Sequence, residues 1–117
     1  MRFLLSVHGD ASSWGTQPED ETQRELEAFA SFEREAKAAG VLVDQGALQP
    51  TAWDLTVEAG APRFAERSVS GPTMGCFYVV NVDAPEQAKE WAARIPLVGR
   101  GGFDRVEIRP FMGQERS

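Results

Sequence analysis

The chain has 117 residues, 42% of them apolar, and this length predicts one domain over residues 1–117 with a modest core. Twelve basic and eighteen acidic residues give a net charge of −6, and because the Arg and Lys residues are scattered, binding to nucleic acid is not expected. No apolar run approaches the length that spans a bilayer, and residues 1–7 are too short for a signal peptide, so we expect a cytoplasmic protein without membrane contacts.

The first segment predicts a strand over residues 2–8, because apolar residues alternate there with the period of two that a strand requires. The two faces of this strand carry Phe3, Leu5 and Val7, and Leu4, Ser6 and His8. A loop over residues 9–17 follows, and it contains Trp14, a large apolar side chain to place on a loop.

A helix is predicted to begin at Pro18, with an acidic first turn, and to end at Gly40 as a left-handed cap. Its apolar positions recur at intervals of three and four and form one stripe: Leu26, Phe29, Phe32 or Glu33, and Ala36. Three strands are predicted next, over residues 41–46, 53–58 and 64–69, with Gly60 and Pro62 turning the chain between the last two.

The last part of the chain predicts a strand, a helix and a final strand. Residues 76–82 are apolar on both faces, and residues 83–86 form a capping pattern for a helix that Pro96 ends. A glycine-rich connection over residues 99–102 leads to the final strand, residues 105–109. The order βαββαβ with an extra hairpin predicts an α+β, ferredoxin-like fold with an antiparallel sheet.

The two strands expected at the centre of this sheet have apolar residues on both faces. The helices of such a fold cover only one face, so the other face of a monomer is normally polar. Leu4 lies opposite Phe3 and Leu5, and Phe77 and Val79 lie opposite Cys76, Tyr78, Val80 and Val82. We therefore expect a second copy to cover the other face in a homodimer. A charge at Leu4 or Val80 is expected to disrupt assembly, because we place both residues on the uncovered face.

Five segments carry a resemblance to a known family: MRFLLSVHGD (1–10), AAGVLVDQGALQP (38–50), GCFYVVNVD (75–83), EWAARIP (90–96) and VEIRP (106–110). Over nearly the whole chain they resemble the YCII-related proteins of the DGPF subgroup. The resemblance implies a ferredoxin-like fold that pairs into a dimeric α/β barrel. The biochemical role of these proteins is mostly unassigned.

Two departures from the family pattern limit what the resemblance implies. The Asp-Gly-Pro-Phe turn of the subgroup is represented only by residues 70–73, Ser-Gly-Pro-Thr, so no role of its aspartate transfers to this chain. Some YCII-like proteins carry a catalytic histidine on the first helix together with an aspartate. This chain has one histidine, His8, at the end of the first strand, where relatives usually have an aromatic residue.

His8 is the candidate for acid–base chemistry, because the pKa of histidine lies near neutrality. Asp10 lies two residues further and is the candidate to orient its imidazole. His8 and Ser6 share the strand face that points away from the helices, so we expect His8, Asp10 and Trp14 to bound one pocket there. The alternative is a histidine at a strand end that is hydrogen-bonded and chemically idle.

Other binding candidates have structural alternatives as well. Trp14 either covers a ligand pocket or packs on the helix, Asp54 is either a pocket acid or an edge charge, and the Tyr78 hydroxyl is placed in the cavity. Cys76 is expected to be a buried structural thiol, since no basic residue lies near it in sequence. One histidine and one cysteine give no ligand spacing for a metal, and we expect neither metal nor cofactor.

Two functions remain open from the sequence. The first is a small cofactor-free enzyme of the isomerase or lyase type, in which His8 moves a proton on a small organic molecule. The second is a binding or accessory protein that uses the same pocket without turnover. An acidic partner and a cavity beside His8 would favour the first function.

Overall fold

The computed structural model describes residues 1–97 and 102–113. These residues form an α+β structure whose elements follow the order β1 (Arg2–Asp10), a short 3-10 helix η1 (Ala11–Ser13), α1 (Glu19–Ala38), β2 (Leu42–Ala47), β3 (Thr51–Glu58), β4 (Ala61–Ser68), β5 (Pro72–Asn81), α2 (Pro85–Ala92) and β6 (Phe103–Pro110). The predicted order of strands and helices is confirmed, with boundaries that differ by a few residues.

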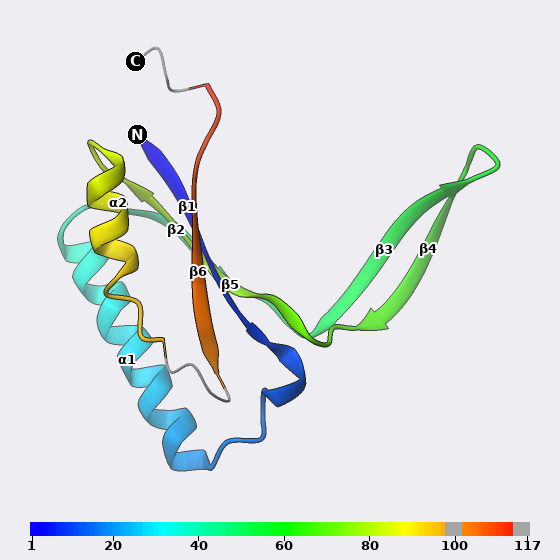
Figure 1. The fold of residues 1–117 in the computed structure, drawn as a ribbon, viewed down its shortest axis with the longest axis horizontal. Helices are drawn as coiled ribbons and strands as arrows, with labels where there is room; N and C mark the ends of the chain where they lie inside the picture. The colour runs from blue at the N-terminus through cyan, green and yellow to red at the C-terminus, as the bar shows by residue number, and fades with distance from the viewer. Residues whose placement is uncertain (98–101, 114–117) are drawn as a thin grey trace.

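The main sheet has the strand order β2-β5-β1-β6, and all neighbouring strands are antiparallel. Both helices lie on one side of this sheet, and the β3–β4 hairpin extends away on the other side (Figure 1). The arrangement is compatible with a ferredoxin-like fold into which the hairpin is inserted between β2 and β5. No helix in residues 1–97 and 102–113 is long and apolar enough to cross a membrane.

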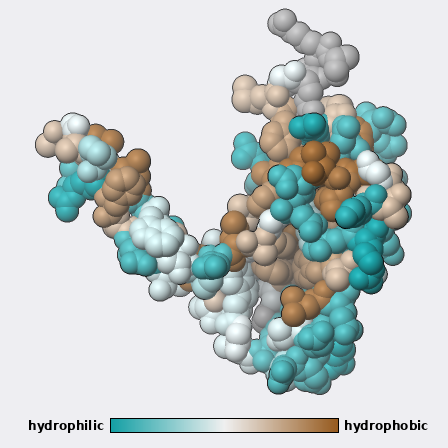
Figure 2. All heavy atoms as spheres, turned by 180° about the vertical axis from the view of Figure 1, so that it is seen from behind, coloured by the Kyte–Doolittle hydropathy of each residue, from teal (hydrophilic) through white to brown (hydrophobic). Residues whose placement is uncertain are grey.

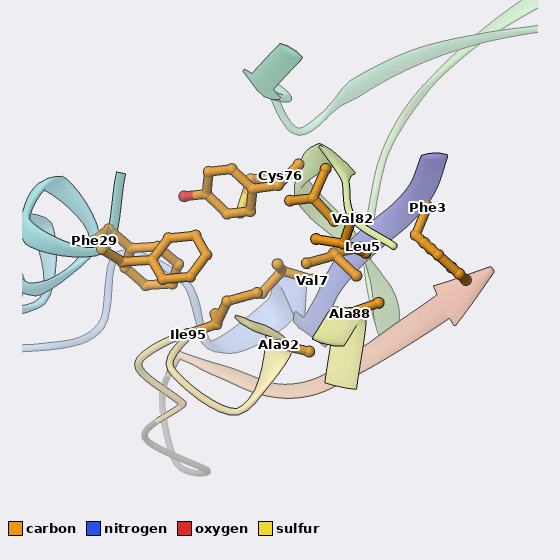
Figure 3. Close-up of a cluster of buried hydrophobic side chains, with 12 residues drawn as sticks. Phe3, Leu5, Val7, Phe29, Cys76, Val82, Ala88, Ala92 and Ile95 are labelled. Carbon is orange, nitrogen blue, oxygen red and sulfur yellow. The ribbon is translucent and has the colours of Figure 1, made fainter. Parts of the chain in front are cut away.

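The core lies between the two helices and the sheet, because the alternation of β1 and β5 places one set of apolar residues under the helices (Figure 3). Leu5 and Tyr78 pair across the two strands, and Val7 pairs with Cys76. The predicted inward residues of β1 are buried. The largest fully buried side chains are Phe3, Leu5, Val7 and Val80.

Helix α1 contributes part of its predicted stripe to this core. Phe29, Phe32 and Ala36 are buried, and Gly40 takes the predicted left-handed conformation with φ of 74°. Leu26 differs from the prediction, because it is 60% exposed. It lies one helical turn before Phe29, where the loop that follows β1 leaves a hollow beside the helix.

Helix α2 begins as predicted after Asp83, but its cap differs. The expected acid was Glu86, whereas the side-chain oxygen Oε1 of Gln87 accepts hydrogen bonds from the backbone N–H groups of Asp83 and Ala84, at 2.6 and 3.3 Å. The glycine-rich connection predicted at residues 99–102 lies outside the described residues except for Gly102, which is buried.

The hairpin formed by β3 and β4, called the arm below, is a separate two-stranded sheet. Its strands are joined by Ala59 and Gly60, both with positive φ (50° and 79°), as in a type I′ turn. The turn predicted at Gly60 and Pro62 was therefore placed too late, and Pro62 lies within β4. Proline is tolerated there because β4 is an edge strand.

The sheet face away from the helices, called the open face below, is apolar at its centre and charged at its edges. Leu4, Phe77 and Val79 on the central strands are half-buried on this face. The placement of Val80 on the open face is wrong, because Val80 pairs with Phe3 and is fully buried under the helices. On the edge strand β6, the residues paired with this face of β1 are Arg105, Glu107 and Arg109. The open face thus presents an apolar centre between charged edges.

The alternation of β1 predicts different costs for truncating two neighbouring leucines. Leu5→Ala is expected to lower the free energy of unfolding by about 2–5 kcal/mol, because it leaves a cavity in the core. The matched control, Leu4→Ala on the open face, is expected to cost about 1 kcal/mol or less in dilute solution. Urea denaturation followed by circular dichroism measures both, and equal costs would contradict the assignment of the two faces.

Candidate functional site

A pocket of about 370 Å³ lies between α1 and the sheet, on the helix side. Its floor comes from β5, one wall from α1, and the opposite wall from the loop after η1 and the start of β6. The lining residues are Trp14, Gly15, Gln17, Thr22, Glu25, Leu26, Phe29, Glu33, Ala47, Leu48, Gly75, Cys76, Tyr78, Gly102 and Phe103. The lining is mostly apolar with a few polar groups, as is typical of small-molecule sites.

A bulge in β5 creates the space at the pocket floor. Val7 pairs with Cys76 and His8 with Met74, so Gly75 is the extra residue between two regular pairs. A Cβ atom at Gly75 would overlap the Phe103 ring and lie 2.9 Å from Cη2 of Trp14. Only glycine therefore lets these two aromatic rings approach the strand.

Three aromatic rings form the apolar part of the pocket. Phe103 makes edge-to-face contacts with Trp14 and Phe29, with ring centroids 5.5 and 5.7 Å apart. Trp14 thus lines the pocket, the first of its two predicted alternatives, and its ring contact is with Phe103 of β6. Its indole N–H is buried without a hydrogen-bond partner, the one such side-chain atom in the described part of the chain.

The polar part of the pocket includes two carboxyl groups, from Glu25 and Glu33, and the phenol of Tyr78. The Tyr78 hydroxyl donates a hydrogen bond of 2.6 Å to Oε2 of Glu33. Burial raises the pKa of Tyr78, and the hydrogen bond to Glu33 raises it further, so the phenol is neutral at physiological pH. Burial also raises the pKa of Glu25, although hydrogen bonds from Gln17 and the Phe103 backbone partly oppose this shift.

Cys76 lies at the floor of the pocket as a thiol. Burial raises its pKa to about 12, and the nearby charges of Glu33 and Glu25 act in the same direction. A thiol with this pKa holds almost no thiolate at neutral pH, which leaves it a poor nucleophile. The predicted burial of the Cys76 thiol is confirmed.

His8 and Ser6 lie on the open face, on the other side of the sheet from this pocket. The Nε2 atom of His8 is 3.0 Å from Oγ of Ser6, which also donates to the Glu107 carbonyl at 3.4 Å. Burial, and next the charge of Arg105, lower the pKa of His8, so its imidazole is mainly neutral at pH 7. Ser6 itself is buried, with 4% of its surface exposed.

Asp10 does not orient the imidazole. Its carboxylate caps η1 instead, because Oδ1 accepts hydrogen bonds from the backbone N–H and the hydroxyl of Ser12. These bonds lower the pKa of Asp10, whose side chain is exposed. The single chain therefore does not bring His8, Asp10 and Trp14 into one pocket, since Trp14 lies on the helix side. A role for His8 and Asp10 in catalysis stays a prediction.

Asp54 lies on the arm, away from the pocket. It forms an ion pair with Arg67, with 2.5 Å between Oδ2 and Nε, so of the two alternatives for Asp54 the structure shows an exposed strand charge. Tyr78 does reach a cavity as predicted, but the cavity is on the helix side of the sheet. The structure thus brings Trp14 and Tyr78 together and leaves Ser6, His8, Asp10 and Asp54 elsewhere.

Sequence reasoning missed three residues of the pocket, Glu25, Glu33 and Phe103. Glu33 carried a signal, because it occupies a position of the apolar stripe of α1 where a carboxylate needs a partner. Glu25 and Phe103 carried none, because their neighbours come from segments far apart in the sequence. Among the described residues, no group of three or more His, Cys, Asp or Glu side chains is arranged to hold a metal ion.

Comparison with known proteins gives one family. Residues 1–112 match the family model of the YCII-related domain. No curated protein matches the chain. The match covers nearly the whole sequence, and membership of the DGPF subgroup stays a prediction.

The raised pKa of Glu25 predicts a pH-dependent stability. Because the folded chain holds this proton more strongly than the unfolded chain, the wild type loses stability as pH rises above the ordinary pKa of 4.5. The Glu25→Gln variant should therefore gain stability relative to the wild type, and this difference in the free energy of unfolding should increase between about pH 4 and pH 7. Urea denaturation measures this, with Glu35→Gln on the exposed side of α1 as the control. A gain that does not vary with pH would contradict the burial of this carboxyl group.

Proposed function

We propose that this chain, which belongs to the YCII-related family, binds a small organic molecule in the pocket between α1 and the sheet. The observation that carries this proposal is the pocket itself, with three aromatic rings at its walls and a Tyr78–Glu33 hydrogen bond inside it. The geometry favours binding over catalysis by His8. His8 is hydrogen-bonded to Ser6, and Asp10 is engaged with Ser12.

The charges of the pocket define the class of ligand. Glu25 and Glu33 both line it, and no basic side chain appears among the lining residues that the structure describes. An anion would meet two carboxyl groups, whereas an amine or an amide N–H finds acceptors. We therefore expect a neutral or positively charged molecule with an aromatic or branched apolar body. The unpaired indole N–H of Trp14 adds a hydrogen-bond donor once the side chain turns toward a ligand.

Binding is tested with aromatic probes that share one ring system and differ only in carrying an amine, an amide or a carboxylate. The amine is expected to bind most tightly, and Glu33→Gln should weaken its binding about tenfold by removing the opposite charge. Glu35→Gln, on the exposed side of the same helix, should leave the affinity unchanged. Titrations followed by NMR chemical shifts also locate the probe.

Two outcomes would overturn this proposal. Tight binding of the carboxylate probe with no effect of Glu33→Gln would contradict the ligand class. If a bound molecule is converted and His8→Ala abolishes its conversion, the enzyme interpretation replaces the binding interpretation. Under the binding proposal, His8→Ala leaves the affinity unchanged, because His8 lies on the other side of the sheet.

We also propose that two copies pack through their open faces, in the dimeric arrangement that the sequence predicted. The support is the apolar centre of this face, formed by Leu4, Phe77 and Val79, which the helices of the same chain do not cover. Ser6 and His8 lie on this face and would be enclosed between the two sheets. In this proposal, His8 belongs to the interface.

The dimer proposal predicts which charges disrupt assembly. Val79→Asp is expected to abolish the dimer at micromolar concentration, because it buries a charge in the apolar centre of the interface. Glu107→Lys, on the exposed edge strand, should have a much smaller effect. Val80 is unsuitable for this test, because it is fully buried under the helices. Light scattering behind a sizing column measures the mass, and a wild-type monomer would contradict the proposal.

A further inference from the structure

The arm exposes a face that is apolar along its length. Directly paired residues share one face of a hairpin, and the pairs Leu55 with Phe64 and Val57 with Pro62 are entirely apolar. Trp53 lies on the same face, paired with Glu66. The exposed fractions of the large side chains on this face run from 57% for Leu55 to 72% for Phe64.

The opposite face of the arm is polar, and its charged side chains form ion pairs with one another. Asp54 forms an ion pair with Arg67, and Glu58 pairs with Arg63 at 2.9 Å. Strands with one polar and one apolar face are typical of a sheet that packs on another surface. The sequence of the arm therefore has the pattern of a half-buried sheet, whereas its own chain leaves it exposed.

An isolated two-stranded hairpin is at best marginally stable in water, so the arm needs a surface to pack on. Its base is held by the backbone hydrogen bonds from Val69 N to the Pro50 carbonyl, at 2.7 Å, and from Leu48 N to the Gly75 carbonyl, at 2.8 Å. The arm thus leaves the body in a defined direction. Figure 2 shows the arm projecting from the body, with hydrophobic and hydrophilic side chains along it.

We propose that the apolar face of each arm packs on a second copy of this chain, so that two arms clasp the dimer. The inference rests on the face-to-face dimer proposed above and adds the arm to its interface. The arm extends on the side of the sheet that the helices leave free (Figure 1), so a copy seated on the open face lies next to the arm. In a dimer with two-fold symmetry, the apolar faces of both arms and both open faces are then buried in the same interface.

Surface area and charge both favour a second copy as the occupant. With aromatic side chains burying about 150–250 Å² each, the exposed parts of Trp53 and Phe64 offer roughly 200–350 Å² per arm. Two arms and the surfaces that they cover therefore contribute much of the roughly 1,600 Å² of a stable interface. Glu66, on the apolar face of the arm, also finds the opposite charge on a second copy, because Arg105 and Arg109 lie on the open face.

The arm proposal is tested on the purified full-length chain by hydrogen–deuterium exchange at protein concentrations below and above the dimer dissociation constant. The amides of β3 and β4 are expected to be protected from exchange only at the concentrations at which the dimer forms. Leu55→Glu should raise the dissociation constant of the dimer about 100-fold, because each of the two copies would bury one charge in the interface. Thr56→Glu, the next residue on the polar face and paired with Arg63, is the matched control and should dimerise like the wild type.

The outcomes separate this proposal from the dimer proposal. A dimer with unprotected arm amides, or one that Leu55→Glu leaves intact, overturns the arm proposal and leaves the face-to-face dimer standing. Protection of the arm in a monomer also overturns it, because the arm then packs on its own chain. Phe64→Glu repeats the test on the other strand, and an unchanged melting temperature of its monomer shows that the body remains folded.

Discussion

The pairing of β1 with β5 is the interaction on which the rest of this structure depends. Both strands are apolar on both faces, and their register aligns Leu5 with Tyr78 on one face and Leu4 with Val79 on the other. The helices can cover only one of these faces. The covered face becomes the core, and the same pairing unavoidably leaves an apolar centre on the open face. A shift of β1 by one residue would exchange its two faces and place Ser6 and His8 under the helices, so these two polar residues favour the observed register.

The bulge at Gly75 changes this pairing at one end and thereby creates the pocket. After the bulge, Tyr78 and Val80 of β5 are buried under the helices. At the bulge, the missing side chain leaves room for Phe103 and Trp14, which come from opposite ends of the chain. Their rings line the wall of the hollow, while Leu26 of α1 remains exposed at the same site. Gly75 thus allows the two rings that line the pocket wall to approach the strand.

The strands and helices could be predicted from the sequence because their signals are local. Alternation identified the faces of β1, and Pro18 and Gly40 marked the ends of α1. The candidate site could be predicted only in part. Trp14 and Tyr78 were selected for chemical reasons, but their shared pocket depends on contacts with Phe29 and Phe103 that no local pattern encodes. For Asp10, a contact was expected that the structure does not show. Asp10 is close to His8 in sequence, but its carboxylate accepts hydrogen bonds from Ser12 instead of orienting the imidazole.

The proposed ligand binding and the proposed assembly use opposite faces of the sheet. The pocket lies on the helix side, whereas the apolar centre of the open face and the arm lie on the other side. Surface ion pairs such as Asp54–Arg67 contribute about 0–1 kcal/mol each, too little to hold an isolated hairpin together. In the proposal above, contacts of its apolar face with a second copy stabilise the arm, and no residue of β3 or β4 lines the pocket. Under these proposals, substitutions in the arm alter assembly while the pocket keeps its shape, although β5 and β6 contribute residues to both the pocket and the open face.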